Sequence, residues 1–174
     1  MDSAGNSLEY TIARRITVPR GEVFRAWTEP ALLSQWWGPH ATVNPECAID
    51  PRPGGKLTIL MRDYEGTDYP LNGEVLDLVA PDYLVLSLDV SHYPPEWHEA
   101  LIPDHPNHSP GLRVRADFAD AGDATHLDVR VDFATPTLRD AYLRAGLAQG
   151  WEEGLDSLAA LLRPILTSTP NPPL

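Results

Sequence analysis

The residues best able to do chemistry lie in one tract between Ser91 and Gly111, SHYPPEWHEALIPDHPNHSPG. It holds four of the six histidines of this 174-residue chain: His92, His98, His105 and His108. Tracts rich in histidine can bind zinc or nickel. However, no spacing here matches a compact helical ligand pair, and five prolines stiffen the tract without defining a site. We therefore predict no metal, and only His98 is a candidate for acid–base work, which requires it to lie inside a cavity.

Two other sets of residues could react with or bind a ligand. Cys47 is the single cysteine, with no basic residue beside it, which favours a structural thiol over a nucleophile. Asp140 and Arg144 stand four residues apart in a predicted helix. They form either a surface ion pair or, if that end of the helix borders a cavity, a site where Arg144 meets the acidic head of a ligand.

Motifs for common catalytic chemistries are missing from the sequence. It contains no Gly-x-Ser-x-Gly, His-Glu-x-x-His, Gly-x-Gly-x-x-Gly or P-loop pattern. We expect no cofactor, and the sequence favours a protein that is not an enzyme.

Charge and composition exclude several classes of partner. The formal net charge of −12 opposes binding to nucleic acid or to anionic membrane surfaces, because clustered Lys and Arg are needed there. No apolar run reaches the roughly 18 residues of a membrane span, and MDSAGNSLEY has no features of a secretion signal. With a single cysteine, these features predict a cytoplasmic protein.

The elements that must position these residues can be read from periodicity. Alternation from Leu8 to Val18 predicts a strand, and Arg20–Thr28 and Ala31–Trp37 predict two short helices joined at Pro30. Further strands are predicted, one of them around Cys47 and the others at 56–62, 72–79, 83–90, 112–119 and 125–133. One long helix is predicted from Pro136 to Pro164, with Thr135 as its cap. This order predicts an α+β fold in which the helix covers a curved antiparallel sheet.

Four blocks of sequence resemble one known family in order and spacing. They are ITVPRGEVFRAWTEPALLSQWWGP, DPRPGGKLTILMRDYEG, GEVLDLVAPDYLVLSL and GWEEGLDSLAALL. This pattern is similar to that of homologues of the activator of the heat-shock-protein-90 ATPase, in the START-like (SRPBCC) superfamily. The resemblance implies the helix-grip fold of the birch-pollen allergen: seven antiparallel strands grip the C-terminal helix, with a cavity between them. We expect one such domain over residues 8–166, with flexible tails at 1–7 and 167–174.

Adjacent tryptophans and spaced glycines bear on that cavity. Neighbouring helical residues point about 100° apart, so we expect Trp36 to anchor its helix and Trp37 to be the exposed partner at the cavity or its rim; packing alone is the alternative. Gly146, Gly150 and Gly154 recur at every fourth residue of the predicted long helix. They either allow close approach of other backbone or leave room for a ligand.

These observations lead to one main hypothesis and two alternatives. The main hypothesis is a module that binds a small hydrophobic molecule between the sheet and the C-terminal helix. The Ser91–Gly111 tract would form a lid, with Trp97 and Leu101 turned inward on a short helical turn; a surface that supports a dimer is the alternative for this tract. The predicted binding residues are Trp27, Trp37, Leu57, Ile59, Met61, Trp97, His98, Val114, Phe118, Arg144, Trp151 and Leu155.

The alternatives use the same fold in other ways. The chain could act as a co-chaperone that binds a chaperone protein of the heat-shock-protein-90 type, or as a cyclase or hydrolase in which His98 or Arg144 polarises the substrate. Both a monomer and a homodimer are compatible with the sequence.

Overall fold

A computed structural model describes residues 8–102 and 111–163 of the chain. Both predicted tails, the end of the predicted 8–166 domain, and His105 and His108 lie outside these ranges. None of the described helices is both long and apolar enough to cross a bilayer.

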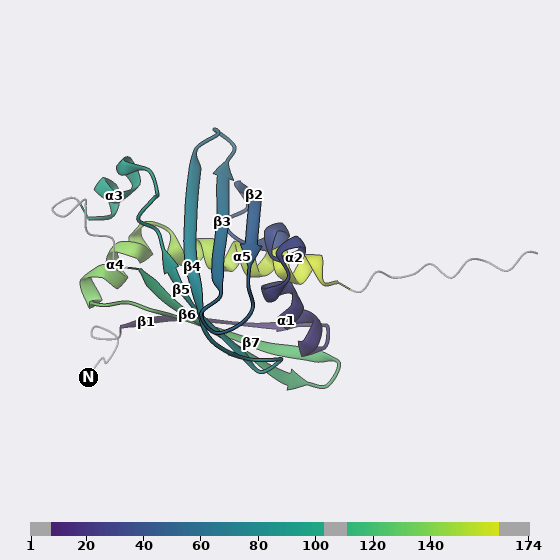
Figure 1. The fold of residues 1–174 in the computed structure, drawn as a ribbon. Coiled ribbons are helices and arrows are strands. Elements are labelled where there is room, and N and C mark those ends of the chain that lie inside the picture. Colours follow the sequence, from purple (N-terminus) through teal and green to yellow (C-terminus); the bar gives the residue numbers. More distant parts are fainter. Residues whose placement is uncertain (1–7, 103–110, 164–174) are drawn as a thin grey trace, which may run out of the picture.

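Seven strands form one antiparallel sheet in the order β1-β7-β6-β5-β4-β3-β2. The strands are β1 (Glu9–Ile16), β2 (Thr42–Ile49), β3 (Lys56–Asp63), β4 (Asp68–Val79), β5 (Tyr83–Asp89), β6 (Leu112–Ala121) and β7 (Ala124–Asp132). The α+β class, the strand count and the helix-grip arrangement are confirmed. The sheet curls around the C-terminal helix (Figure 1).

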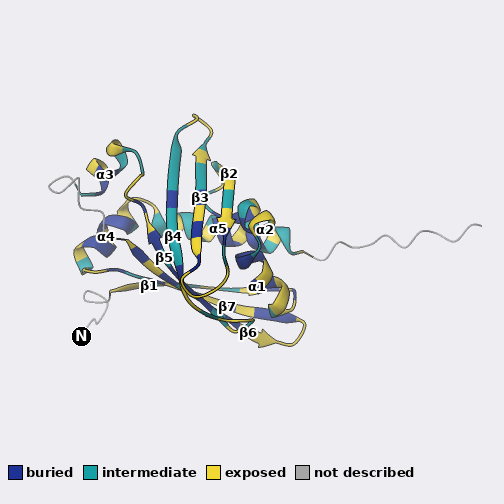
Figure 2. Ribbon diagram, in the orientation of Figure 1, coloured by how far each residue is buried: buried dark blue, intermediate teal, exposed yellow. Residues whose placement is uncertain are grey.

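Alternation of apolar and polar residues sets which face of the sheet is inside. In β7, Leu127, Val129 and Val131 are buried, whereas the residues between them are exposed. Phe118 and Val114 of β6 stand opposite Leu127 and Val131, so the two strands present one continuous apolar face. Figure 2 shows the same alternation of buried and exposed residues along the strands.

Two short helices follow β1, as predicted. They are α1 (Arg20–Thr28) and α2 (Pro30–Trp36), and Pro30 occupies the first turn of α2. The Trp36 indole Nε1 donates a hydrogen bond to the Ala26 carbonyl at 2.9 Å. This bond fixes α2 against α1, so Trp36 has the anchoring position expected of it.

The prediction of one unbroken C-terminal helix is wrong. The chain forms α4 (Pro136–Arg144) and α5 (Leu147–Leu161) instead, and the break falls at Gly146, whose φ is +96°. Glycine adopts this left-handed conformation without a steric penalty, and it commonly ends a helix. The predicted cap is confirmed, because the Thr135 hydroxyl accepts a hydrogen bond from Leu138 N at 3.1 Å.

Part of the His-rich tract forms a further helix, α3 (Pro95–Leu101). Pro95 occupies its first turn, and its buried residues are His98 and Leu101. The predicted helical turn with Leu101 inward is therefore present.

A cavity between the sheet and the C-terminal helices

The curled sheet, α4 and α5 enclose a cavity of about 380 Å³. This volume falls within the range of small-molecule sites in proteins, roughly 300–1,000 Å³. Strands β3, β4, β5 and β6 form the wall on the sheet side, and α4 and α5 form the wall on the helix side. The lining residues are Trp36, Trp37, Gly38, Pro39, Ala41, Thr42, Met61, Asp63, Tyr69, Leu71, Leu88, Val90, Tyr93, Trp97, Leu112, Tyr142, Ala145, Gly146, Leu147, Gly150, Trp151 and Gly154.

The cavity reaches the surface beside the α4–α5 break. Ala145 and Gly146 line the cavity and are also exposed, and so is the lining residue Ala41. The helix break therefore lies at the rim of the cavity, and small side chains border the opening.

Both tryptophans of the adjacent pair line the cavity and both are buried, so the expectation of an exposed Trp37 is wrong. Trp37 is only 7% exposed. Trp37 caps α2 with a helical φ of −63°, and its N–H donates to the Leu33 carbonyl at 3.2 Å, so its ψ of 132° redirects only the chain that follows it. The Trp37 ring therefore keeps its helical direction, and it is buried because Trp151 of α5 covers it, edge to face at a centroid distance of 5.5 Å.

Glycines on α5 bring the helix close to the segment that follows α2. A Cβ built on Gly154 would lie 3.5 Å from the carbonyl oxygens of Trp36 and Gly38, and one on Gly150 would lie 3.6 Å from Pro39 Cγ. Both glycines also line the cavity. The two roles considered for these glycines, close approach of other backbone and room for a ligand, therefore occur together.

Asp63 is the single charged residue among the described residues that line the cavity. Its Oδ1 accepts hydrogen bonds from Thr67 N at 2.9 Å and Glu65 N at 3.0 Å, and its Oδ2 accepts one from the Tyr69 hydroxyl at 3.3 Å. These bonds, first of all that from the Thr67 backbone, hold the pKa of Asp63 below its usual value. The carboxylate is thus ionised and already engaged by the β3–β4 turn.

The half-buried Tyr93 and the buried Tyr142 contribute two phenols to the cavity. Burial is the main cause that raises the pKa of each hydroxyl above its usual value, so both stay protonated. Aromatic contacts connect them: the Trp97 ring lies 4.9 Å from Tyr93 and 5.8 Å from Tyr142. This aromatic group lines the cavity next to α3, which carries Trp97.

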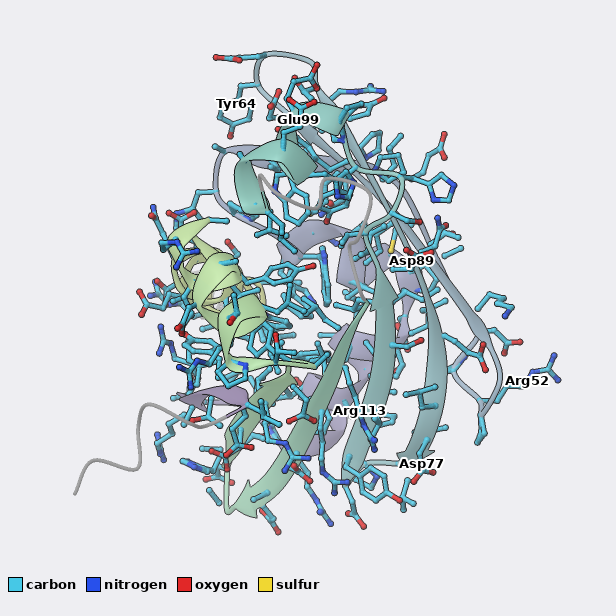
Figure 3. All side chains as sticks on the ribbon, turned by 90° about the vertical axis from the view of Figure 1, so that its left-hand side faces the viewer. Arg52, Tyr64, Asp77, Asp89, Glu99 and Arg113 are labelled. Atoms are coloured by element: carbon cyan, nitrogen blue, oxygen red, sulfur yellow. The ribbon has the colours of Figure 1, made fainter. Side chains whose placement is uncertain are left out.

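Figure 3 shows α3, which carries the labelled Glu99, at the same end of the molecule as Tyr64 and at the opposite end from Asp77. Trp97 of α3 lines the cavity, whereas its neighbour His98 is buried but is not among the lining residues. The ring of His98 instead packs against the edge of Trp97 at 5.2 Å. The side chain proposed for acid–base work is therefore not placed inside the hollow.

The structure brings together only part of the predicted set of binding residues. Those that line the cavity are Trp37, Met61, Trp97 and Trp151. Others are buried in the packed core outside it: Trp27, Leu57, Ile59, Val114, Phe118 and Leu155. Trp27 and Phe118 show the reason, since their rings contact each other at 5.9 Å and fill the interior next to α1.

Arg144 does not line the cavity either. It is the last residue of α4 and is exposed. Asp140, the partner predicted for Arg144, pairs instead with Arg139. The Nη2 atom of Arg139 lies 2.8 Å from Oδ1 of Asp140. Sequence spacing indicated a shared face for Asp140 and Arg144, but the neighbouring arginine takes the carboxylate.

Several lining residues were missed by the sequence analysis, and two had a usable signal. Tyr69 stands opposite Met61 in the β3–β4 ladder, so the predicted inward position of Met61 implies the position of Tyr69. Tyr142 follows the buried Leu138 at helical spacing. No described group of three or more His, Cys, Asp or Glu side chains could hold a metal ion.

A comparison with family models matches residues 17–163 to the family described as Activator of Hsp90 ATPase homolog 1-like protein. The chain belongs to this family. Membership in the Hsp90-ATPase-activator homologue family supports, in general terms, a ligand-binding or activator-like module. No curated protein sequence matches the chain significantly.

Solved structures similar to the chain share the fold of this family. Protein NE0264 from Nitrosomonas europaea has a TM-score of 0.75 at 25% identity, over 92% of this chain and 96% of that one. Protein Ms6760 from Mycobacterium smegmatis has a TM-score of 0.74 at 21% identity, over 94% and 93%. CalU16 from Micromonospora echinospora has a TM-score of 0.60 at 22% identity, over 90% and 76%.

Proposed function

We propose that this chain is a non-enzymatic module that binds a small, largely hydrophobic molecule in the cavity between the sheet and the C-terminal helices. The observation that carries the proposal is the cavity itself, because a fold that packs Trp27 and Phe118 tightly at one end leaves about 380 Å³ at the other. Apolar walls supply affinity through buried surface, at about 0.8 kcal/mol for each buried CH₂ group.

The walls are suited to a flat apolar molecule. Trp37 and Trp151, in edge-to-face contact, line the cavity from the helices, and Met61 and Leu71 line it from the sheet. Tyr93 and Trp97 belong to the Ser91–Gly111 tract and line the cavity, which supports a lid role for the described part of that tract.

The test uses N-phenyl-1-naphthylamine, an uncharged apolar probe whose fluorescence rises on burial. We expect saturable binding at a stoichiometry of one. Trp151→Ala should weaken it by about tenfold or more, because a large part of the apolar wall is lost. The matched control is Leu127→Ala, which truncates a fully buried side chain outside the cavity and should leave the affinity unchanged in the folded protein. Failure of lipids, sterols and aromatic probes alike to bind would refute the proposal.

A co-chaperone role is the second candidate, and the family description favours it. It requires a protein-binding surface rather than a hollow. Measurement of ATP turnover by an Hsp90-type chaperone at saturating concentrations of this protein separates the two. Stimulation that survives Trp151→Ala would support the co-chaperone role, and unchanged turnover would count against it.

A further inference from the structure

The Tyr142 hydroxyl is a polar group whose bonding is incomplete. Tyr142 lines the cavity and is 3% exposed, and its ring contacts Trp97 at 5.8 Å and Phe133 at 5.7 Å. Its oxygen is buried and has no hydrogen-bond partner among the residues that the structure describes. A buried hydroxyl without a partner is destabilising, so a group that enters the cavity and completes its bonding would be stabilised in return.

This hydroxyl is a donor at any pH that the folded protein normally meets. Burial, and next the Asp89 carboxylate, raise the pKa of Tyr142 above 10.0, and the proximity of Tyr142 further raises that of Tyr93. Neither phenol ionises near neutral pH. A protonated phenol both donates and accepts, and the O–H proton of Tyr142 needs an acceptor that no described residue supplies.

The charge around the cavity selects against anions. The described lining residues include no Lys, Arg or His, and their one charge is the Asp63 carboxylate. Asp89 lies close enough to Tyr142 to shift its pKa. A carboxylate or phosphate in this hollow would lose its hydration and find no cation in return.

The walls are also unusually rich in rings. The aromatic lining residues are Trp36, Trp37, Tyr69, Tyr93, Trp97, Tyr142 and Trp151. These rings meet one another edge to face or tilted, which leaves ring faces and edges around the hollow for contact with another ring system.

We infer that the cavity takes an uncharged aromatic molecule that ends in a hydrogen-bond acceptor, a carbonyl or ether oxygen, and that Tyr142 Oη donates to this oxygen. The inference rests on the proposed function and narrows it: the phenol next to α3 fixes the orientation of the ligand, and the apolar walls fix its position.

The experiment compares three probes of one size: 2-acetylnaphthalene, 2-ethylnaphthalene and 2-naphthoate. Affinities are measured by equilibrium dialysis for the wild type, for Tyr142→Phe and for the control Tyr83→Phe. Tyr83 donates its hydrogen bond to Asp77 at the opposite end of the molecule (Figure 3) and does not line the cavity. We expect Tyr142→Phe to weaken binding of the ketone by about 3- to 10-fold and to leave the ethyl analogue unchanged. Tyr83→Phe should affect neither, and naphthoate should bind most weakly of the three.

A second readout separates this role from a structural one. Without ligand, Tyr142→Phe should unfold at the same urea concentration as the wild type or at a higher one, because the change removes an unpaired polar atom. Equal loss of ketone and ethyl binding, no loss of either, or naphthoate binding as tight as that of the ketone would overturn the inference while leaving the hydrophobic site in place. Absence of binding by every probe would overturn the proposed function as well.

Discussion

At the scale of single residues, the adjacent tryptophans show that packing against another helix, and not helical spacing alone, decides whether a side chain is exposed. Trp36 ends α2 with its indole bonded to Ala26, and Trp37 leaves the helix with an extended backbone. Helical spacing predicted divergent rings, but both reach the cavity wall.

Cys47 allows a prediction at the same scale. Partial burial in β2 raises its thiol pKa from an ordinary 9.0 to about 11. At pH 8 the thiolate fraction is then roughly 100-fold below that of an ordinary thiol. We expect alkylation by iodoacetamide to be slower in the folded protein by about this factor than in the same chain unfolded in urea. The rate should rise about tenfold for each pH unit up to about 11. Rapid modification of the folded protein at pH 8 would contradict the structural role.

At the scale of elements, the break between α4 and α5 decides the shape of the cavity. An unbroken helix would carry Tyr142 and Trp151 along one straight axis. The left-handed Gly146 instead lets α4 turn, and Tyr142 and Trp151 line the same hollow.

Two alanine substitutions in this region should have opposite outcomes. Gly146→Ala forces a side chain into a φ of +96° and should lower the free energy of unfolding by about 1–2 kcal/mol. Gly150→Ala lies inside α5, where its Cβ meets only Pro39 Cγ at 3.6 Å. It should be neutral or stabilise the helix by up to about 1 kcal/mol, while it reduces the volume open to the naphthylamine probe. Urea unfolding measures both, and equal effects would contradict the assignment of the break to Gly146.

At the scale of the whole molecule, the interior divides into a packed end and a hollow end. Rings of Phe24, Trp27 and Phe118 fill the packed end, with centroid distances of 5.4 and 5.9 Å. The hollow end lies between β3–β6 and the two C-terminal helices. Different side chains of the one sheet fill the packed end and line the hollow end. Substitutions can therefore change the stability of the fold and the binding of a ligand separately.

Truncation at the two ends tests this division. Phe118→Ala should cost about 3–5 kcal/mol of unfolding free energy, because it opens a void in close-packed surroundings. Met61→Ala should lower the free energy of unfolding by much less, because Met61 is only partly buried on a wall that already borders free space. It should nevertheless weaken binding of the probe. If Phe118→Ala weakened the probe and Met61→Ala did not, the position assigned to the site would be wrong.

The sequence by itself determined the order of the elements and their inward faces, because alternation along strands such as β7 and helical spacing along α5 follow from local geometry. Pro30, Thr135 and Pro136 marked helix starts for the same reason. The hollow was decided only by the tertiary structure. Whether an inward side chain such as Phe118 or Met61 meets another side chain or open space depends on the curl of the sheet and on where α4 turns away from α5. The curl of the sheet and the turn of α4 are set by contacts between residues far apart in the chain, and no local sequence pattern predicts such contacts.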